Sequence, residues 1–173
     1  MIKRIALLVT LLLMAFSATC LAARIYVDNE YHYSIQLPDG FKTVPTKDGC
    51  IMSAADSKGA TMDVTIRQGT AKEIKAENNK KAFRNLSADY LAEFEKQNFQ
   101  IYNEYTININ PDSYGYYLEG APLDKHDLGI SKNAYVKFIY LGQVYTVTYV
   151  SPYDSKDYLK NFSLFRKSIN ILK

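Results

Sequence analysis

The residues of this chain that could do chemistry are few, and their spacing matches no common catalytic or metal-binding motif. The two histidines, His32 and His126, form no His-x-x-x-His spacing, and there is no Cys-x-x-Cys pair, so no ordinary zinc site is expected. Residues 124–127 (Asp-Lys-His-Asp) place two carboxylates and an imidazole in one loop, which could hold a divalent cation. Because Lys125 would repel a cation and polar residues also fill loops for solvation alone, we expect no metal and no cofactor.

A nucleophilic mechanism has equally little support. His32 and Ser34 share one face of an expected strand, but a serine nucleophile needs a base that a third group orients, usually in a strained turn. The glycine-containing segments 39–40 and 56–59 are typical of turns and lack the spacing of phosphate-binding loops. We therefore predict no catalytic residue and a protein that is not an enzyme.

Tyrosine is the most unusual part of the composition, with fifteen tyrosines and no tryptophan. Five of them lie near expected strand ends or turns: Tyr114, Tyr116, Tyr117, Tyr149 and Tyr153. Exposed tyrosines give a large contact area at low entropic cost, so these five are candidates for a binding surface. The alternative is that they fill half-buried sheet positions because tyrosine has high β-propensity, and the sequence favours this alternative.

The first 22 residues have the layout of a secretory signal peptide. Lys3 and Arg4 precede an apolar run over residues 5–16, which is about twelve residues long, whereas a membrane-spanning helix needs roughly twenty. The small side chains of Cys20 and Ala22 favour cleavage after Ala22. We therefore predict a protein that is periplasmic or secreted, with no stable membrane anchor after cleavage.

A lipoprotein acylated at Cys20 is the alternative for this segment. The preceding residues Ser17, Ala18 and Thr19 lack the leucine and the small final residue that are usual before an acylated cysteine. Removal of the segment also takes Lys3 and Arg4, so 21 basic residues become 19 against 18 acidic ones. A net charge of 19 − 18 = +1 gives no reason to expect a nucleic-acid partner.

Hydrophobic patterning predicts one α+β domain over residues 23–173, with Cys50 as its single thiol. The strands are expected at 24–27, 31–37, 50–55, 61–68, 100–109, 114–118, 135–141 and 144–150, and the helices within 70–98 and after 152. Ser87 is the expected N-cap of the first helical segment, and Asp154 or Ser155 that of the last. Gly142-Gln143 favours a type II′ turn that places Tyr140 opposite Tyr145.

Residues 33–41 (Tyr-Ser-Ile-Gln-Leu-Pro-Asp-Gly-Phe) resemble the opening motif Y-S-I-x-x-P-x-G-W/F of the Mog1/PsbP-like superfamily. The tyrosine-rich hairpin, then Phe162, Phe165 and the ending at 168–171, are similar to the last hairpin, helix and short strand of that family. The resemblance implies an antiparallel β-sheet sandwiched by helices, an αβα sandwich. It also implies a non-enzymatic role, as in photosystem extrinsic subunits, a nuclear-transport GTPase cofactor and secreted bacterial proteins.

The sequence therefore predicts a non-catalytic extracytoplasmic binding or accessory protein whose partner is an unknown protein or envelope ligand. Two alternatives stay open. One is a hydrolase of envelope material that uses His32 or His126, and the other is a cation-binding structural protein of the envelope.

Overall fold

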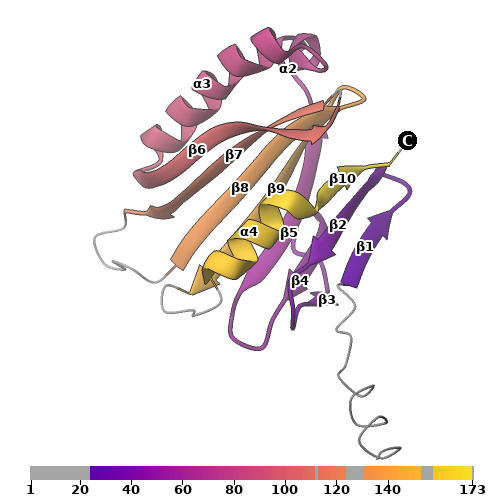
Figure 1. Ribbon diagram of the computed structural model, residues 1–173, viewed down its shortest axis with the longest axis vertical. Coiled ribbons are helices and arrows are strands. Elements are labelled where there is room, and N and C mark those ends of the chain that lie inside the picture. The colour runs from indigo at the N-terminus through magenta and orange to yellow at the C-terminus, as the bar shows by residue number, and fades with distance from the viewer. Residues whose placement is uncertain (1–23, 112, 124–130, 153–157, 173) are drawn as a thin grey trace, which may run out of the picture.

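The computed structural model describes residues 24–111, 113–123, 131–152 and 158–172 (Figure 1). Within these ranges, the strands form a seven-stranded sheet in the order β3-β4-β5-β9-β8-β7-β6 and a three-stranded sheet in the order β1-β2-β10. The large sheet contains β3 (Lys42–Val44), β4 (Cys50–Ala55), β5 (Thr61–Gln68), β6 (Phe99–Asn110), β7 (Ser113–Pro122), β8 (Ser131–Tyr140) and β9 (Gln143–Pro152). The small sheet contains β1 (Arg24–Asp28), β2 (Tyr33–Leu37) and β10 (Ile169–Ile171). Neighbouring strands are antiparallel in both sheets.

Both faces of the large sheet are covered. Helices α2 (Ala71–Ala76) and α3 (Lys80–Lys96) lie along one face, whereas α4 (Tyr158–Ser168) and the small sheet lie against the other (Figure 1). The fold is therefore mixed α+β with an antiparallel sheet between helices, which confirms the predicted class. Among the described residues, no helix is long and apolar enough to span a membrane.

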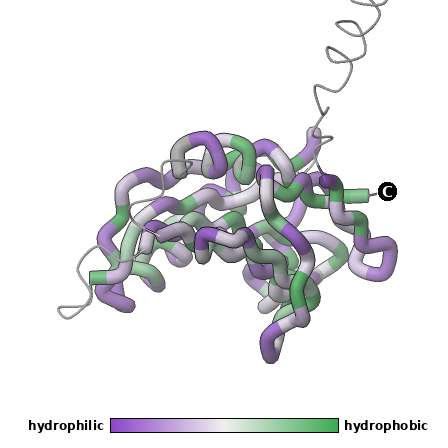
Figure 2. The backbone as a smooth tube through the Cα atoms, turned by 90° about the horizontal axis from the view of Figure 1, so that it is seen from below, coloured by the Kyte–Doolittle hydropathy of each residue, from purple (hydrophilic) through white to green (hydrophobic). Residues whose placement is uncertain are grey.

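Two apolar cores hold the layers together. The first core lies beneath the small sheet and α4, where Tyr33 and Ile35 pack with Val64, Val147 and Phe165. β10 belongs to this core, and its segment of the tube, beside the C label, has hydrophobic colour in Figure 2. Burial of this strand joins the end of the chain to β2 near its beginning.

The second core lies beneath the long helix α3. Phe83, Tyr90 and Phe94 project from this helix onto Tyr116 and Leu118 of β7. Their helical spacing produces a single apolar stripe, which is what allows α3 to cover the sheet.

The helix boundaries follow local capping. The Thr70 hydroxyl and the Glu73 carboxylate form a reciprocal capping box at the start of α2. Asn79 caps α3 by accepting a hydrogen bond from Ala82 N at 3.0 Å. The prediction that Ser87 is an N-cap is wrong: it lies inside α3, where its hydroxyl donates to Phe83 O.

The predicted register of the β8–β9 hairpin is also wrong. Leu141 and Gly142 form the turn with φ values of 49° and 73°, as a type I′ turn requires. Tyr140 therefore pairs with Gln143, and Phe138 pairs with Tyr145. The shift is two residues, so each side chain keeps its predicted face and the core is unaffected.

Candidate functional site

Four of the five candidate tyrosines lie in the described residues, and three of them are buried. Tyr116 is 1% exposed, and Tyr117 and Tyr149 are equally inaccessible. Tyr114 is half-buried with its ring 6.3 Å from that of Phe83, and Tyr153 lies outside the described residues. The prediction of an exposed aromatic surface is therefore wrong for Tyr116, Tyr117 and Tyr149.

The burial of these rings follows from the layer structure. Consecutive residues of a strand point to opposite faces, and both faces of the large sheet are covered. Tyr116 consequently contacts Tyr90 of α3, with ring centroids 5.9 Å apart. Tyr117 stacks on Tyr105 at 4.8 Å, and Tyr149 packs on Phe41 and Phe165. These tyrosines are core residues of the sandwich.

The candidate nucleophile and base are not brought together. His32 lies exposed in the turn between β1 and β2 with a φ of 53°, and its ring is T-shaped to that of Tyr140 with the ring centroids 6.5 Å apart. Ser34 is buried within β2. The loop at 124–127, which was considered as a cation site, lies outside the described residues. In the ranges that the structure describes, no three His, Cys, Asp or Glu side chains are grouped as a metal site.

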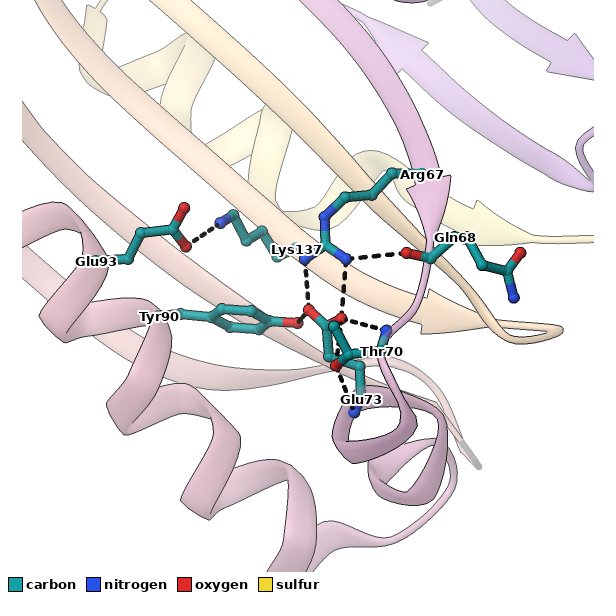
Figure 3. Close-up of polar contacts among 7 residues, drawn as sticks. All are labelled: Arg67, Gln68, Thr70, Glu73, Tyr90, Glu93 and Lys137. Carbon is teal, nitrogen blue, oxygen red and sulfur yellow. Dashed lines mark hydrogen bonds and ion pairs between the residues drawn. The ribbon is translucent and has the colours of Figure 1, made fainter.

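A polar cluster that sequence reasoning missed lies between α2, α3 and the sheet (Figure 3). The Arg67 guanidinium donates to both oxygens of Glu73, at 2.8 Å and 2.5 Å. The Tyr90 hydroxyl donates to Glu73 Oε1 at 2.8 Å, and the backbone N–H of Thr70 donates to Oε2 at 2.8 Å. Nearby, Lys137 Nζ donates to Glu93 at 3.0 Å and lies 4.7 Å from the centre of the Tyr90 ring.

The electrostatics of this cluster favour a structural role. Hydrogen bonds from Arg67 outweigh burial and lower the pKa of Glu73 to about 2, so the carboxylate stays ionised and is a very weak base. Burial, followed by the hydrogen bond to Glu73, raises the pKa of Tyr90. Both carboxylate oxygens of Glu73 already accept hydrogen bonds from the surrounding donors. The cluster therefore fixes α2 and α3 to the sheet.

A polar pocket of about 220 Å³ lies where α4 meets two turns. Its lining includes Asp39, Asp56, Lys58, Lys160 and Asn161. Asp56 accepts backbone hydrogen bonds from its own turn, and Asp39 forms an ion pair of 2.9 Å with Lys160. Both carboxylates therefore have structural partners.

An apolar groove of about 280 Å³ lies where the start of β1 and the end of β2 meet β3. Its lining among the described residues is Arg24, Ile25, Tyr26, Leu37, Lys42 and Thr43, which combines apolar side chains with two cations and includes no carboxylate. β1 and β3, which flank it, are both edge strands. We call this groove together with Val27 the β1 edge surface.

Strand alternation explains why this surface is apolar. Tyr26 points inward, with its ring 6.0 Å from that of Tyr33, so its neighbours Ile25 and Val27 point outward. They are 65% and 51% exposed, respectively. Asp28 ends the strand by accepting hydrogen bonds from the N–H groups of Glu30 and Tyr31. Sequence reasoning found this strand but could not tell that it lies at an edge.

No protein-family model and no curated protein matches the sequence. The fold is similar to the solution structure of cyanobacterial PsbP (CyanoP) from Synechocystis sp. PCC 6803, at 13% identity and a TM-score of 0.60 over 90% of this chain and 95% of that chain. It is also similar to LpqN of Mycobacterium tuberculosis, described as involved in cell envelope biogenesis, at 10% identity and a TM-score of 0.54 over 90% and 88% of the two chains. The chain therefore has the Mog1/PsbP-like fold that the motif at residues 33–41 predicts.

Proposed function

We propose that this protein is a non-catalytic accessory protein outside the cytoplasm and binds a protein partner through the β1 edge surface. The observation that carries the proposal is the exposure of Ile25 and Val27 on an edge strand beside an apolar groove. Large apolar side chains that are grouped on a surface often mark interaction sites. Burying their apolar surface in a complex contributes roughly 25 cal/mol of binding free energy per Å².

The remaining chemistry supports binding better than catalysis. Arg67, Glu73 and Tyr90 form a hydrogen-bonded cluster among themselves. Catalysis needs a group whose pKa suits proton transfer near neutral pH, and the Glu73 carboxylate has a pKa of about 2. The proposal assigns these residues to the scaffold that presents β1.

Export is supported by the layout of residues 1–22, and the envelope role stated for LpqN is in keeping with it. The test is N-terminal sequencing of protein recovered from the extracytoplasmic fraction of the source cells. We expect a first residue of Ala23 or Arg24. A diacylglyceryl cysteine at position 20, or recovery only from the cytoplasm, would contradict this part of the proposal.

Binding is tested by capture from envelope extracts with the immobilised protein. We expect I25S/V27S to reduce recovery of the captured partner by about tenfold or more, since buried apolar anchors dominate binding energy. The control is I74S, which removes an apolar side chain that is 43% exposed on α2, and it should capture normally. Equal recovery with wild type and I25S/V27S would contradict the proposed surface.

A further inference from the structure

The β1 edge surface is complementary to its own sequence, and we propose that it binds β1 of a second copy of this chain. The two copies pair antiparallel about a twofold axis at Tyr26, so that their small sheets become continuous. This inference rests on the proposed function, because it names the partner of the same surface.

Charge and hydropathy select one register for this pairing. With Tyr26 on the axis, Arg24 lies opposite Asp28 of the second copy, and Ile25 lies opposite its Val27. The Arg24–Asp28 pair then forms twice, by symmetry, and Ile25 and Val27 of each copy gain an apolar cross-strand neighbour. An axis at Ile25 or at Val27 leaves one of the charged residues outside the paired strand.

The backbone of β1 supports strand addition. Within the described ranges, β1 pairs with β2 on one side only, so N–H and C=O groups along its other side face away from the sheet. The remaining edge strands are better protected. β3 and β10 have only three residues each and β3 begins with Lys42, whereas β6 has register irregularities and is contacted by β10.

The groove is also electrostatically complementary to β1 of a second copy. Arg24 and Lys42 both line it, and no carboxylate of the described residues does. The register brings Asp28 of the second copy to Arg24, at the end of β1 where the two cations lie. A second copy therefore provides a carboxylate for the two cations of the groove, together with Val27 as the cross-strand neighbour of Ile25.

The test is a charge exchange followed by sedimentation velocity of the purified protein over a range of concentrations. Wild type should shift toward the mass of two copies as concentration rises. R24D and D28R should each associate about tenfold more weakly, because each places like charges opposite one another twice. An equal mixture of R24D and D28R should recover association, because one copy then has an acidic edge and the other a basic edge.

Asp28 also caps its turn, so D28R could weaken association by disturbing the fold. Two further variants separate this effect from a loss of pairing. I25K/V27K changes only exposed side chains and should abolish association without changing the melting temperature. V44K, which places the same charge on the β3 edge, should associate as wild type does.

Wild type that stays monomeric at all concentrations would overturn the inference, as would R24D and I25K/V27K that associate like wild type. Either result leaves the proposed function to be decided by the capture experiment. If monomeric wild type captures a different envelope protein through Ile25 and Val27, the β1 edge surface is supported as the binding site and the second copy is excluded as its partner.

Discussion

Glu73 of α2 and Arg67 of β5 face each other across the junction between helix and sheet, joined by two hydrogen bonds of 2.8 Å and 2.5 Å. The side chain of Glu73 is buried, whereas that of Arg67 is half exposed. Tyr90 of α3 donates to the same carboxylate, so one buried anion connects two helices to the large sheet. A charge in this position is stabilising only while all its donors are present.

We predict that E73Q lowers the free energy of unfolding by about 2 kcal/mol or more, because the amide cannot accept the same charged hydrogen bonds. The pKa of Glu73 falls from its usual 4.5 to about 2 in the folded protein, so its contribution is complete above about pH 4.5 and is lost as pH falls toward 2. Denaturant unfolding at pH 6 and at pH 3 measures this difference.

The matched control is E95Q, at an exposed carboxylate on α3. It should leave both the stability and its acid dependence near those of wild type. Equal acid dependence in E73Q and wild type would show that the Glu73 cluster does not stabilise the fold.

Tyr116 should behave as a core residue. We predict that Y116A costs about 3–5 kcal/mol, because it leaves a cavity beneath α3 beside Tyr90. Y102A removes the same ring from a position that is 40% exposed and should cost about 1 kcal/mol or less. Chemical denaturation of both variants compares them. Similar small losses would place Tyr116 on the surface after all.

The β8–β9 turn contains a residue with a strained backbone conformation, and a substitution can relieve this strain. Leu141 has a φ of 49°, which is unfavourable for a leucine. Because its side chain is 66% exposed, few packing contacts offset this backbone strain. Its backbone N–H donates to Glu77 at 2.7 Å, and this bond survives substitution. We predict that L141N stabilises the protein by about 0.5–1 kcal/mol, since Asn-Gly favours type I′ turns.

Thermal melting of L141N and of L141V distinguishes the cause. Valine is β-branched and tolerates a positive φ worse than leucine does, so L141V should lower the melting temperature by a few degrees. A melting temperature of L141N below that of wild type would mean that Leu141 contributes a contact that outweighs its backbone strain.

Local patterns were sufficient to predict eight of the ten strands in the described residues, whereas β3 was not expected and β10 was expected only from the family resemblance. Alternation placed Met62 and Val64 on a buried face, and the segment at 33–41 led to the correct fold. The β8–β9 register was missed because Gly142 suits either of two turns, and only the sheet decides between them. Ser87 was misplaced because a serine inside a helix can bond backward to Phe83, which sequence cannot distinguish from a cap.

The candidate surface could not be predicted because it depends on strand order. Tyr116 and Tyr117 lie near a turn in sequence, yet β7 is an inner strand with covered faces on both sides. Ile25 and Val27 have the alternation of an ordinary hairpin strand and are exposed because they alternate with the inward-pointing Tyr26, whereas the free backbone edge beside them follows from the position of β1 at the end of its sheet. The local sequence pattern therefore predicts neither the inner position of β7 nor the edge position of β1.

The most direct test of the β1 edge surface is photo-crosslinking in living cells. A photoreactive benzoylphenylalanine replaces Ile25 in one strain and the exposed Arg84 of α3 in another. We predict an ultraviolet-dependent adduct from position 25, with the mass of two copies of this chain, and no such adduct from position 84. Absence of any adduct at position 25, or the same adducts from both positions, would contradict the assignment of β1 as the binding surface.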